Sequence, residues 1–234
     1  MKKTVIFKLL FMSLISLFGL QVNAQDWANL KKYKAENATL QLPSKHESRV
    51  VFMGNSITQQ WKEKDSVFFQ VNPYICRGIS GQTTPQMLLR FRQDVVELQP
   101  KVVVILAGTN DIAGNTGPST LEMIMNNLAS MTEIAKANGI KVILCSILPA
   151  YDYPWRKGLE PNIKIPKMND LIKDYCKKTN TFYLDYFSAM ADDKNGMKPE
   201  LTTDGVHCTL QGYKLMETMV QEAISDVLKN KKTN

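Results

Sequence analysis

The chain has 234 residues, of which 44% are hydrophobic and 22% are charged, and its formal net charge is +7. This length and apolar content exclude a disordered protein and suit one domain with a full core. The basic residues are scattered, apart from a short tail at Lys229, Lys231 and Lys232. We therefore expect no nucleic-acid-binding face, since such a face requires clustered positive charge.

A secretory signal peptide is predicted over residues 1–24. Lys2, Lys3 and Lys8 give the chain a basic start. An apolar stretch of 12 residues without charge follows, Leu9–Leu20, and then small residues suited to cleavage after Ala24. A transmembrane helix needs ~20 residues, which favours cleavage over a retained anchor. No cysteine follows the stretch as a lipid attachment site. We expect an exported protein of bacterial type, periplasmic or extracellular and without stable membrane insertion, whose residues 25–234 form a single domain.

Predicted strands and helices alternate along residues 49–228. Strands are predicted over 49–53, 74–79, 101–108, 140–148 and 181–187. Helices are predicted over 57–65, 84–98, 119–139, 165–178 and from about 209 onward. The helix over 119–139 has Ser119 or Thr120 as its N-terminal cap and Gly139 as its stop. This alternation predicts an α/β fold, in which helices cover both faces of a parallel sheet.

Polar residues follow the predicted strands at the point where each strand ends. Ser56 follows the first strand, Gly81 the second and Asn110 the third, and Asp204 and His207 come just before the last helix. The carboxyl ends of parallel strands meet at one edge of the sheet, which is where ligands bind. We therefore expect these residues to collect at one site.

Ser56 is a candidate nucleophile as well as a candidate helix cap. A serine hydroxyl attacks an ester only when a base takes its proton. The chain has two histidines. His46 lies in a polar stretch before the first strand and is expected to be solvated. Asp204 can accept a hydrogen bond from one ring nitrogen of His207 and leave the other nitrogen facing Ser56. The alternative is that Asp204 only caps a local turn.

The four blocks resemble, in the right order, the SGNH hydrolases, also called GDSL-like lipases or acylhydrolases. The matching residues are Ser56 in GNS, Gly81 in ISGQTT, Asn110 in GTND and His207 in DGVH. The resemblance implies a flavodoxin-like three-layer α/β/α sandwich with a five-stranded parallel sheet. It also implies catalysis by Ser56, His207 and Asp204. Neither a metal nor an organic cofactor is implied.

The same resemblance implies an oxyanion hole. Its donors would be the backbone N–H groups of Ser56 and Gly81 and the side-chain amide of Asn110. The alternatives are a turn glycine and an asparagine bonded to its own backbone. Asp111 is expected to orient this loop. The chain departs from the family by having Asn55 where Asp is usual and Cys208 where Pro is frequent.

The stretch 149–166 is rich in aromatic and proline residues and leaves the fourth strand on the side of the predicted site. We predict that Tyr153, Trp155 and Arg156, together with Asn55, line the substrate. Aromatic faces suit sugar rings or acyl chains, and an arginine suits an acidic group. The alternative is that Trp155 only holds a long loop to the body of the domain.

These observations predict a secreted serine esterase that acts on small-molecule or glycan esters with short acyl groups, acetyl above all. A lysophospholipase or thioesterase of the same fold is the alternative enzyme. A non-catalytic glycan-binding domain is the alternative from another class, but such a domain has no need of a base beside a serine. The sequence leaves the oligomeric state and the pairing of four cysteines open, although Cys145 lies in an apolar strand and is expected to be a buried thiol.

Overall fold

The computed structural model describes residues 25–229, so the predicted signal peptide lies outside the described residues. Five parallel strands form one sheet in the order β2-β1-β3-β4-β5. The strands are β1 (Val50–Gly54), β2 (Tyr74–Gly78), β3 (Val102–Leu106), β4 (Lys141–Cys145) and β5 (Phe182–Leu184). This order is that of flavodoxin-like sheets, so the predicted fold class is confirmed.

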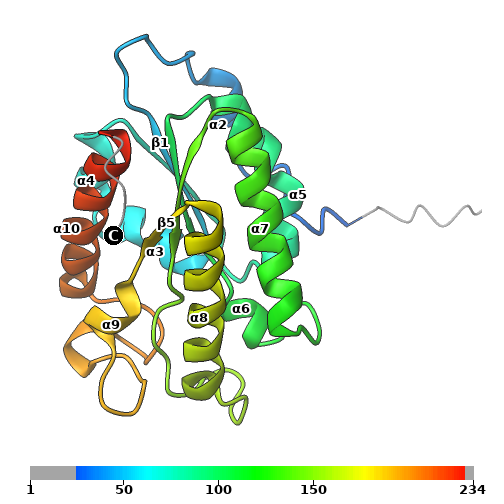
Figure 1. Ribbon diagram of the computed structural model, residues 1–234, viewed down its shortest axis with the longest axis vertical. Helices are drawn as coiled ribbons and strands as arrows, with labels where there is room; N and C mark the ends of the chain where they lie inside the picture. The colour runs from blue at the N-terminus through cyan, green and yellow to red at the C-terminus, as the bar shows by residue number, and fades with distance from the viewer. Residues whose placement is uncertain (1–24, 230–234) are drawn as a thin grey trace, which may run out of the picture.

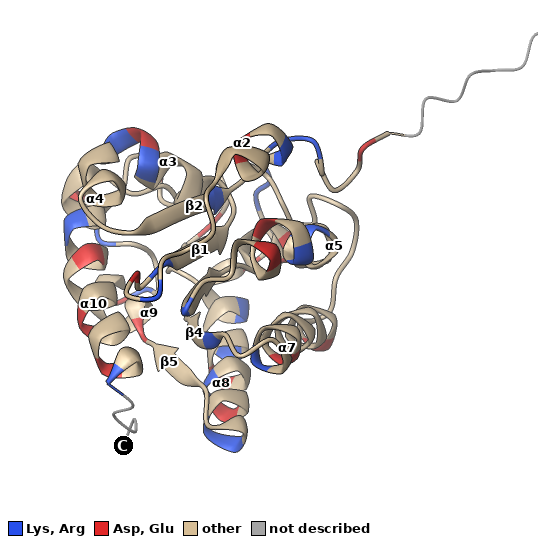
Figure 2. Ribbon diagram, turned by 90° about the horizontal axis from the view of Figure 1, so that it is seen from above, with Lys and Arg blue, Asp and Glu red and all other residues tan. Residues whose placement is uncertain are grey.

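Helices cover both faces of the sheet and give three layers (Figures 1 and 2). One face carries α3 (Ser56–Lys64), α4 (Ser66–Gln70), α9 (Tyr186–Met190) and α10 (Leu210–Leu228). The other face carries α5 (Thr84–Asp94), α7 (Leu121–Ala137) and α8 (Pro161–Thr179), and α2 (Lys34–Thr39) packs on α5. The central strand β1 is buried on both sides, which explains its uninterrupted apolar sequence.

Alternate residues of β1 enter the two hydrophobic cores. Val51 and Met53 pack toward α5, α7 and α8, whereas Val50 and Phe52 pack toward α3, α4 and α10. The ring of Phe52 meets Trp61 of α3 edge-on, with the centroids 5.6 Å apart. Because the side chains of a strand alternate between its faces, these contacts fix the register of β1. They also hold the N-terminus of α3 next to the carboxyl end of β1.

The long helices agree with the sequence prediction and the short ones were not predicted. Thr120 caps α7 by accepting from the backbone N–H of Met123, and Gly139 follows its end in the left-handed region. The strand predicted over 181–187 stops at Leu184, because the Asp185 side chain accepts from Ser188 N and starts α9. The missed helices α2, α4, α6 (Thr109–Ile112) and α9 have four to six residues each.

The strands predicted over 101–108 and 140–148 end earlier, at Leu106 and Cys145, and two helix boundaries also differ from the prediction. The helix predicted over 84–98 ends at Asp94 and gives way to the 3₁₀ turn η1 (Val96–Leu98). Helix α8 begins at Pro161, four residues earlier than predicted, because a proline is favourable in the first turn, where its missing N–H has no partner to lose. Within residues 25–229, none of the helices combines the length and apolar character that crossing a membrane requires.

Candidate active site

In the turn between β1 and α3, the helix cap and the candidate nucleophile are two different residues. Asn55 is the N-cap of α3, and its side-chain oxygen accepts from the backbone N–H of Ile57 at 3.0 Å. Ser56 is the first residue of the helix, so its hydroxyl is not needed for capping. Gly54 is required just before them, because a Cβ there would lie 2.0 Å from the Thr58 hydroxyl oxygen. The prediction that Asn55 lines the substrate is wrong, since its side chain is buried and caps the helix.

Ser56, His207 and Asp204 form a continuous hydrogen-bonded chain. The Ser56 hydroxyl oxygen lies 3.0 Å from Nε2 of His207, and Nδ1 of the same ring lies 2.7 Å from Oδ2 of Asp204. The other carboxylate oxygen of Asp204 accepts from the backbone N–H groups of Val206 and His207. Asp204 therefore both caps the local turn and orients the imidazole, so the two interpretations of this segment hold together.

The carboxyl group of Asp204 is held in its ionised form. Partial burial raises its pKa, but the hydrogen bonds from the His207 backbone, the His207 ring and the Val206 backbone together bring the pKa below the usual value. A carboxylate accepts from Nδ1 only when that nitrogen carries a proton. The lone pair of Nε2 is then directed at the Ser56 hydroxyl, which is the arrangement of a general base beside a nucleophile.

The three predicted oxyanion donors come from three different strand ends. The backbone N–H of Ser56 belongs to the first turn of α3, where such groups have no partner within the helix. Gly81 is exposed and has φ +76°, a backbone conformation that favours glycine. The Nδ2 atom of Asn110 donates to the carbonyl oxygen of Gln82 at 2.9 Å. An amide nitrogen has two protons, so one of them remains for a ligand.

Asp111 fixes the position of the Asn110 turn relative to α5. Its buried carboxylate accepts from the Thr84 backbone N–H at 3.0 Å and from the Thr84 hydroxyl at 2.6 Å. Burial raises the pKa of Asp111 to about 6, against the lowering effect of the bonds from Thr84. Since these bonds join the start of α5 to α6, the predicted orienting role of Asp111 agrees with its contacts.

The loop after β4 brings the exposed ring of Trp155 to the site, whereas Tyr153 is buried. The indole is 46% exposed and its ring centroid lies 6.2 Å from that of His207. Tyr153 is fully buried beneath it, stacked at 5.2 Å, and its hydroxyl meets that of Thr109 at 3.0 Å. Nη1 of Arg156 donates to the carbonyls of Ala113 and Gly114 at 3.0 and 2.7 Å.

The substrate-lining prediction for Tyr153 is therefore corrected. Tyr153 supports the Trp155 ring from below rather than facing the substrate, because its own surface is covered. Nη1 of Arg156 ties its loop to the residues that follow α6, and the residue is exposed, so the predicted contact of Arg156 with the substrate stays a prediction. Side chains in loops follow no period, so the burial of Tyr153 could not be predicted from the sequence.

A hollow of about 290 Å³ lies beside the Asp204 carboxylate. It is lined by Tyr151, Asp152, Tyr153, Pro154, Lys157, Asp192, Gly196, Met197, Asp204 and Gly205. Tyr151 is more than half exposed here. The hollow joins the loop after β4 to the loop that precedes His207, and neither Tyr151 nor Asp192 was among the predicted site residues.

Sequence reasoning also missed Arg90, a fully buried arginine of α5. The signal was available in the helical spacing, because Arg90 lies three residues after Met87 and four before Asp94, on the buried face of the helix. Within residues 25–229, no group of three or more histidine, cysteine or acidic side chains has the arrangement of a metal site.

Comparison with known proteins places this chain among acylhydrolases. The model of the GDSL-like Lipase/Acylhydrolase family matches residues 52–215. A candidate acylhydrolase from Bacteroides fragilis NCTC 9343 is 47% identical, with a TM-score of 0.86 over 87% of this chain and 99% of its own. The uncharacterized lipoprotein YqeF of Bacillus subtilis is 26% identical over 171 residues, which are 62% of this chain and 70% of that protein.

More distant structures have the same fold. A catalytic mutant of an acetylxylan esterase from Geobacillus stearothermophilus is 18% identical, with a TM-score of 0.64 over 79% of this chain and 96% of its own. The family match begins in β1, ends in α10 and includes all the residues of the Ser56 site. On these grounds the chain belongs to the GDSL-like lipase/acylhydrolase family of ester hydrolases.

Proposed function

We propose that the protein is an exported, single-domain serine esterase that removes short acyl groups, acetyl above all, from carbohydrates. The observation that carries the proposal is the hydrogen-bonded chain from the Ser56 hydroxyl through His207 to Asp204, with heavy-atom distances of 3.0 and 2.7 Å. These are the distances at which a general base takes a proton from a nucleophile. Export is supported by the predicted signal peptide and by the relative that is described as a lipoprotein.

The proposed reaction has two halves. In the first half, Ser56 Oγ attacks the ester carbonyl while His207 Nε2 takes its proton, and Asp204 stabilises the imidazolium that forms. The tetrahedral intermediate then breaks its bond to the sugar oxygen, which leaves with the proton from His207. In the second half, water attacks the acylated Ser56 with His207 as base, and the carboxylic acid is released.

The negative oxygen of each tetrahedral intermediate needs hydrogen-bond donors that are already in place. The proposed donors are the backbone N–H groups of Ser56 and Gly81 and the second amide proton of Asn110. The Gly81 backbone is open to a ligand, and its left-handed φ favours glycine. The N-terminus of α3 adds a favourable dipole at Ser56.

The surroundings of the triad favour a carbohydrate as the alcohol part of the ester. The exposed Trp155 ring is held rigidly by Tyr153 beneath it, and a fixed aromatic face suits a sugar ring. The adjoining hollow offers Tyr151 together with the charged groups of Lys157 and Asp192, which are able to bond sugar hydroxyls. The fold shared with an acetylxylan esterase agrees with this substrate class.

Acyl-chain selectivity tests the proposal. Residues 25–234 would be assayed with p-nitrophenyl esters from acetate to dodecanoate, with acetylated xylo-oligosaccharides and with a lysophospholipid. The highest kcat/KM is expected for acetyl esters, and acetate release should vanish in Ser56→Ala. Ser130→Ala, which removes a serine of α7 that bonds only Asn126, is the matched control. A preference for long acyl chains or for the lysophospholipid would support the alternative enzyme, and no hydrolysis of any ester would overturn the proposal.

A further inference from the structure

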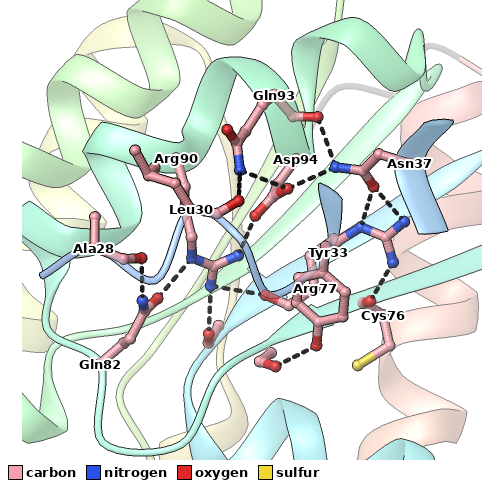
Figure 3. A network of polar contacts seen from close by, with 12 residues as sticks. Ala28, Leu30, Tyr33, Asn37, Cys76, Arg77, Gln82, Arg90, Gln93 and Asp94 are labelled. Carbon is pink, nitrogen blue, oxygen red and sulfur yellow. Dashed lines mark hydrogen bonds and ion pairs between the residues drawn. The ribbon is translucent and has the colours of Figure 1, made fainter. Parts of the chain in front are cut away.

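Arg90 is a buried cation at the centre of a polar network (Figure 3). A buried charge persists only when its hydrogen-bonding groups are paired. The Arg90 guanidinium donates to the Asp94 carboxylate at 3.0 Å and to the side-chain oxygen of Gln82 at 2.6 Å. Its Nη2 atom donates to the backbone carbonyls of Gly54 and Arg77 at 3.1 and 2.8 Å.

Two of these partners belong to the segments that hold the oxyanion donors. Gly54 is the last residue of β1 and lies two residues before Ser56. Gln82 follows Gly81, and its backbone carbonyl accepts from the Asn110 amide at 2.9 Å. One guanidinium thus joins the Gly54 carbonyl to the side chain of Gln82, whose backbone carbonyl in turn accepts from Asn110.

The N-terminal segment holds the far side of the same network. The Gln82 amide nitrogen donates to the Ala28 carbonyl at 2.7 Å, so its oxygen is turned toward Arg90. Asn37 donates to the second carboxylate oxygen of Asp94 at 2.7 Å. These contacts come from residues outside the stretch that matches the family model. Both side-chain acceptors of Arg90 are therefore fixed from two directions.

The planar guanidinium group of arginine presents several N–H donors at fixed angles, whereas the ammonium group of lysine is a single charge on a flexible chain. Oxyanion donors act only when they are held within a few tenths of an ångström of the place where the charge develops. We propose that Arg90 is a positioning residue for catalysis, setting the separation of the Ser56, Gly81 and Asn110 donors through Gly54 and Gln82. This inference rests on the proposed serine esterase function.

Arg77 supplies a matched control in the same network. Its side chain is equally buried, but it donates to Glu36, Asn37 and the Cys76 carbonyl instead of to the oxyanion loops. Arg77→Gln and Arg90→Gln both remove one buried guanidinium and both are expected to lower the unfolding temperature. Only Arg90→Gln is expected to disturb the donors.

The experiment compares steady-state kinetics on p-nitrophenyl acetate with inhibition by an alkylboronic acid, which forms a tetrahedral adduct on the serine. Arg90→Gln should lower kcat at least ~10-fold with KM nearly unchanged, because the lost interaction matters only when charge develops. The boronate inhibition constant should rise by a similar factor. Arg77→Gln should leave both quantities within about twofold of the wild type, whatever its unfolding temperature.

If Arg90→Gln does not fold, Gln82 gives the same test through a smaller change. Gln82→Met removes the acceptor that links Arg90 to the Gly81 loop, and Gln82→Glu restores an acceptor. A kcat that falls in Gln82→Met and recovers in Gln82→Glu supports the inference. Equal kcat in all variants overturns it, and so does an equal loss of kcat in Arg77→Gln and Arg90→Gln. If the wild type hydrolyses no ester, the proposed esterase function is wrong. That result differs from a failure of the Arg90 inference, in which the wild type is active and the variants have equal kcat.

Discussion

Asn55 and Ser56 divide two tasks that a single residue at a helix start often combines. The Asn55 side chain satisfies a backbone N–H of α3, which leaves the Ser56 hydroxyl for His207. An amide oxygen accepts this bond as a carboxylate oxygen would. The replacement of the usual aspartate by Asn55 therefore preserves the geometry of the turn while removing a negative charge next to the proposed nucleophile.

Removal of the Asn110 amide should slow the chemical step. Asn110→Ala deletes one preorganised donor and is expected to lower kcat by ~10²–10³, or about 3–4 kcal/mol. The effect should fall on kcat rather than KM, because the oxyanion exists only in the transition state. Asn126→Ala, on the exposed side of α7, is the control for an asparagine removed elsewhere. A change confined to KM would mean that Asn110 binds the substrate in its ground state.

The raised pKa of Asp111 predicts a specific pH dependence of stability. Its pKa of about 6 in the folded protein lies above the ordinary value of 3.8. The carboxyl group thus favours folding below about pH 4, and this contribution is lost as the pH rises through 6. The loss is on the order of 3 kcal/mol at most. The Asp111→Asn variant lacks this titration and keeps an oxygen for Thr84.

Urea unfolding of the wild type and Asp111→Asn between pH 4 and 7 measures this effect. The free energy of unfolding of the variant, relative to the wild type, should increase over that range. Other groups titrate equally in both proteins and cancel in the difference. A difference that stays constant with pH would show that Asp111 has an ordinary pKa in the folded state.

At the scale of elements, the strands and the long helices could be predicted from the pattern of apolar residues in the sequence. The long helices α5, α7, α8 and α10 have apolar spacing over many residues, the strands are short apolar runs, and the order of polar strand ends predicted the site. Helices α4, α6 and α9 are too short to show a period. They depend on single contacts, such as the bond from Phe68 N to the Asp65 carboxylate that starts α4.

The same reasoning explains where the site prediction failed. Ser56, Asp204 and His207 lie where strand ends and a local turn place them, and the structure brings them together. Tyr153 lies in a loop, and the direction of its side chain depends on a contact with a distant residue, namely Thr109. Such long-range contacts leave no pattern in the local sequence.

Trp155 should distinguish a sugar platform from an acyl pocket. If its ring stacks on the sugar, Trp155→Ala should lower kcat/KM for acetylated xylo-oligosaccharides at least several-fold, since stacking on an aromatic is worth ~1–3 kcal/mol. Activity on p-nitrophenyl acetate should then change little. The control is Trp27→Ala, another exposed indole, on the N-terminal segment. Improved activity on long acyl chains would instead place Trp155 at an acyl pocket, and an effect on stability alone would make it a structural contact.

At the scale of the whole molecule, the N-terminal segment completes the domain from outside the family match. Residues 27–37 supply backbone carbonyls and side chains to α5 and β2, and Tyr33 also places its ring over the Arg77 guanidinium at 4.5 Å. Glu36 of this segment pairs with the buried Arg77, whereas the buried Arg90 pairs with Asp94 of α5. Through the bond from Gln82 to the Ala28 carbonyl, this segment also contacts the loop that holds Gly81.

The core of the whole domain is expected to shield all the thiols. Cys76, Cys145, Cys176 and Cys208 are free and buried, which confirms the prediction for Cys145. Burial also raises the pKa of each thiol, to about 12 for Cys176 and Cys208. A disulfide-exchange reagent should therefore react with none of the four in the native protein and with all four in guanidinium chloride. Fewer than four reactive thiols in the unfolded protein would indicate a disulfide.

The identity of the nucleophile is tested most directly by peptide mapping after treatment with a serine-reactive fluorophosphonate. We expect one adduct per chain, on Ser56, because only that hydroxyl has a base at 3.0 Å within a Ser-His-Asp chain among residues 25–229. The adduct should be absent in Ser56→Ala and should form far more slowly in His207→Ala, while both variants keep the native unfolding temperature within a few degrees. An adduct on another serine, or undiminished labelling of either variant, would contradict the assignment of Ser56 as the nucleophile.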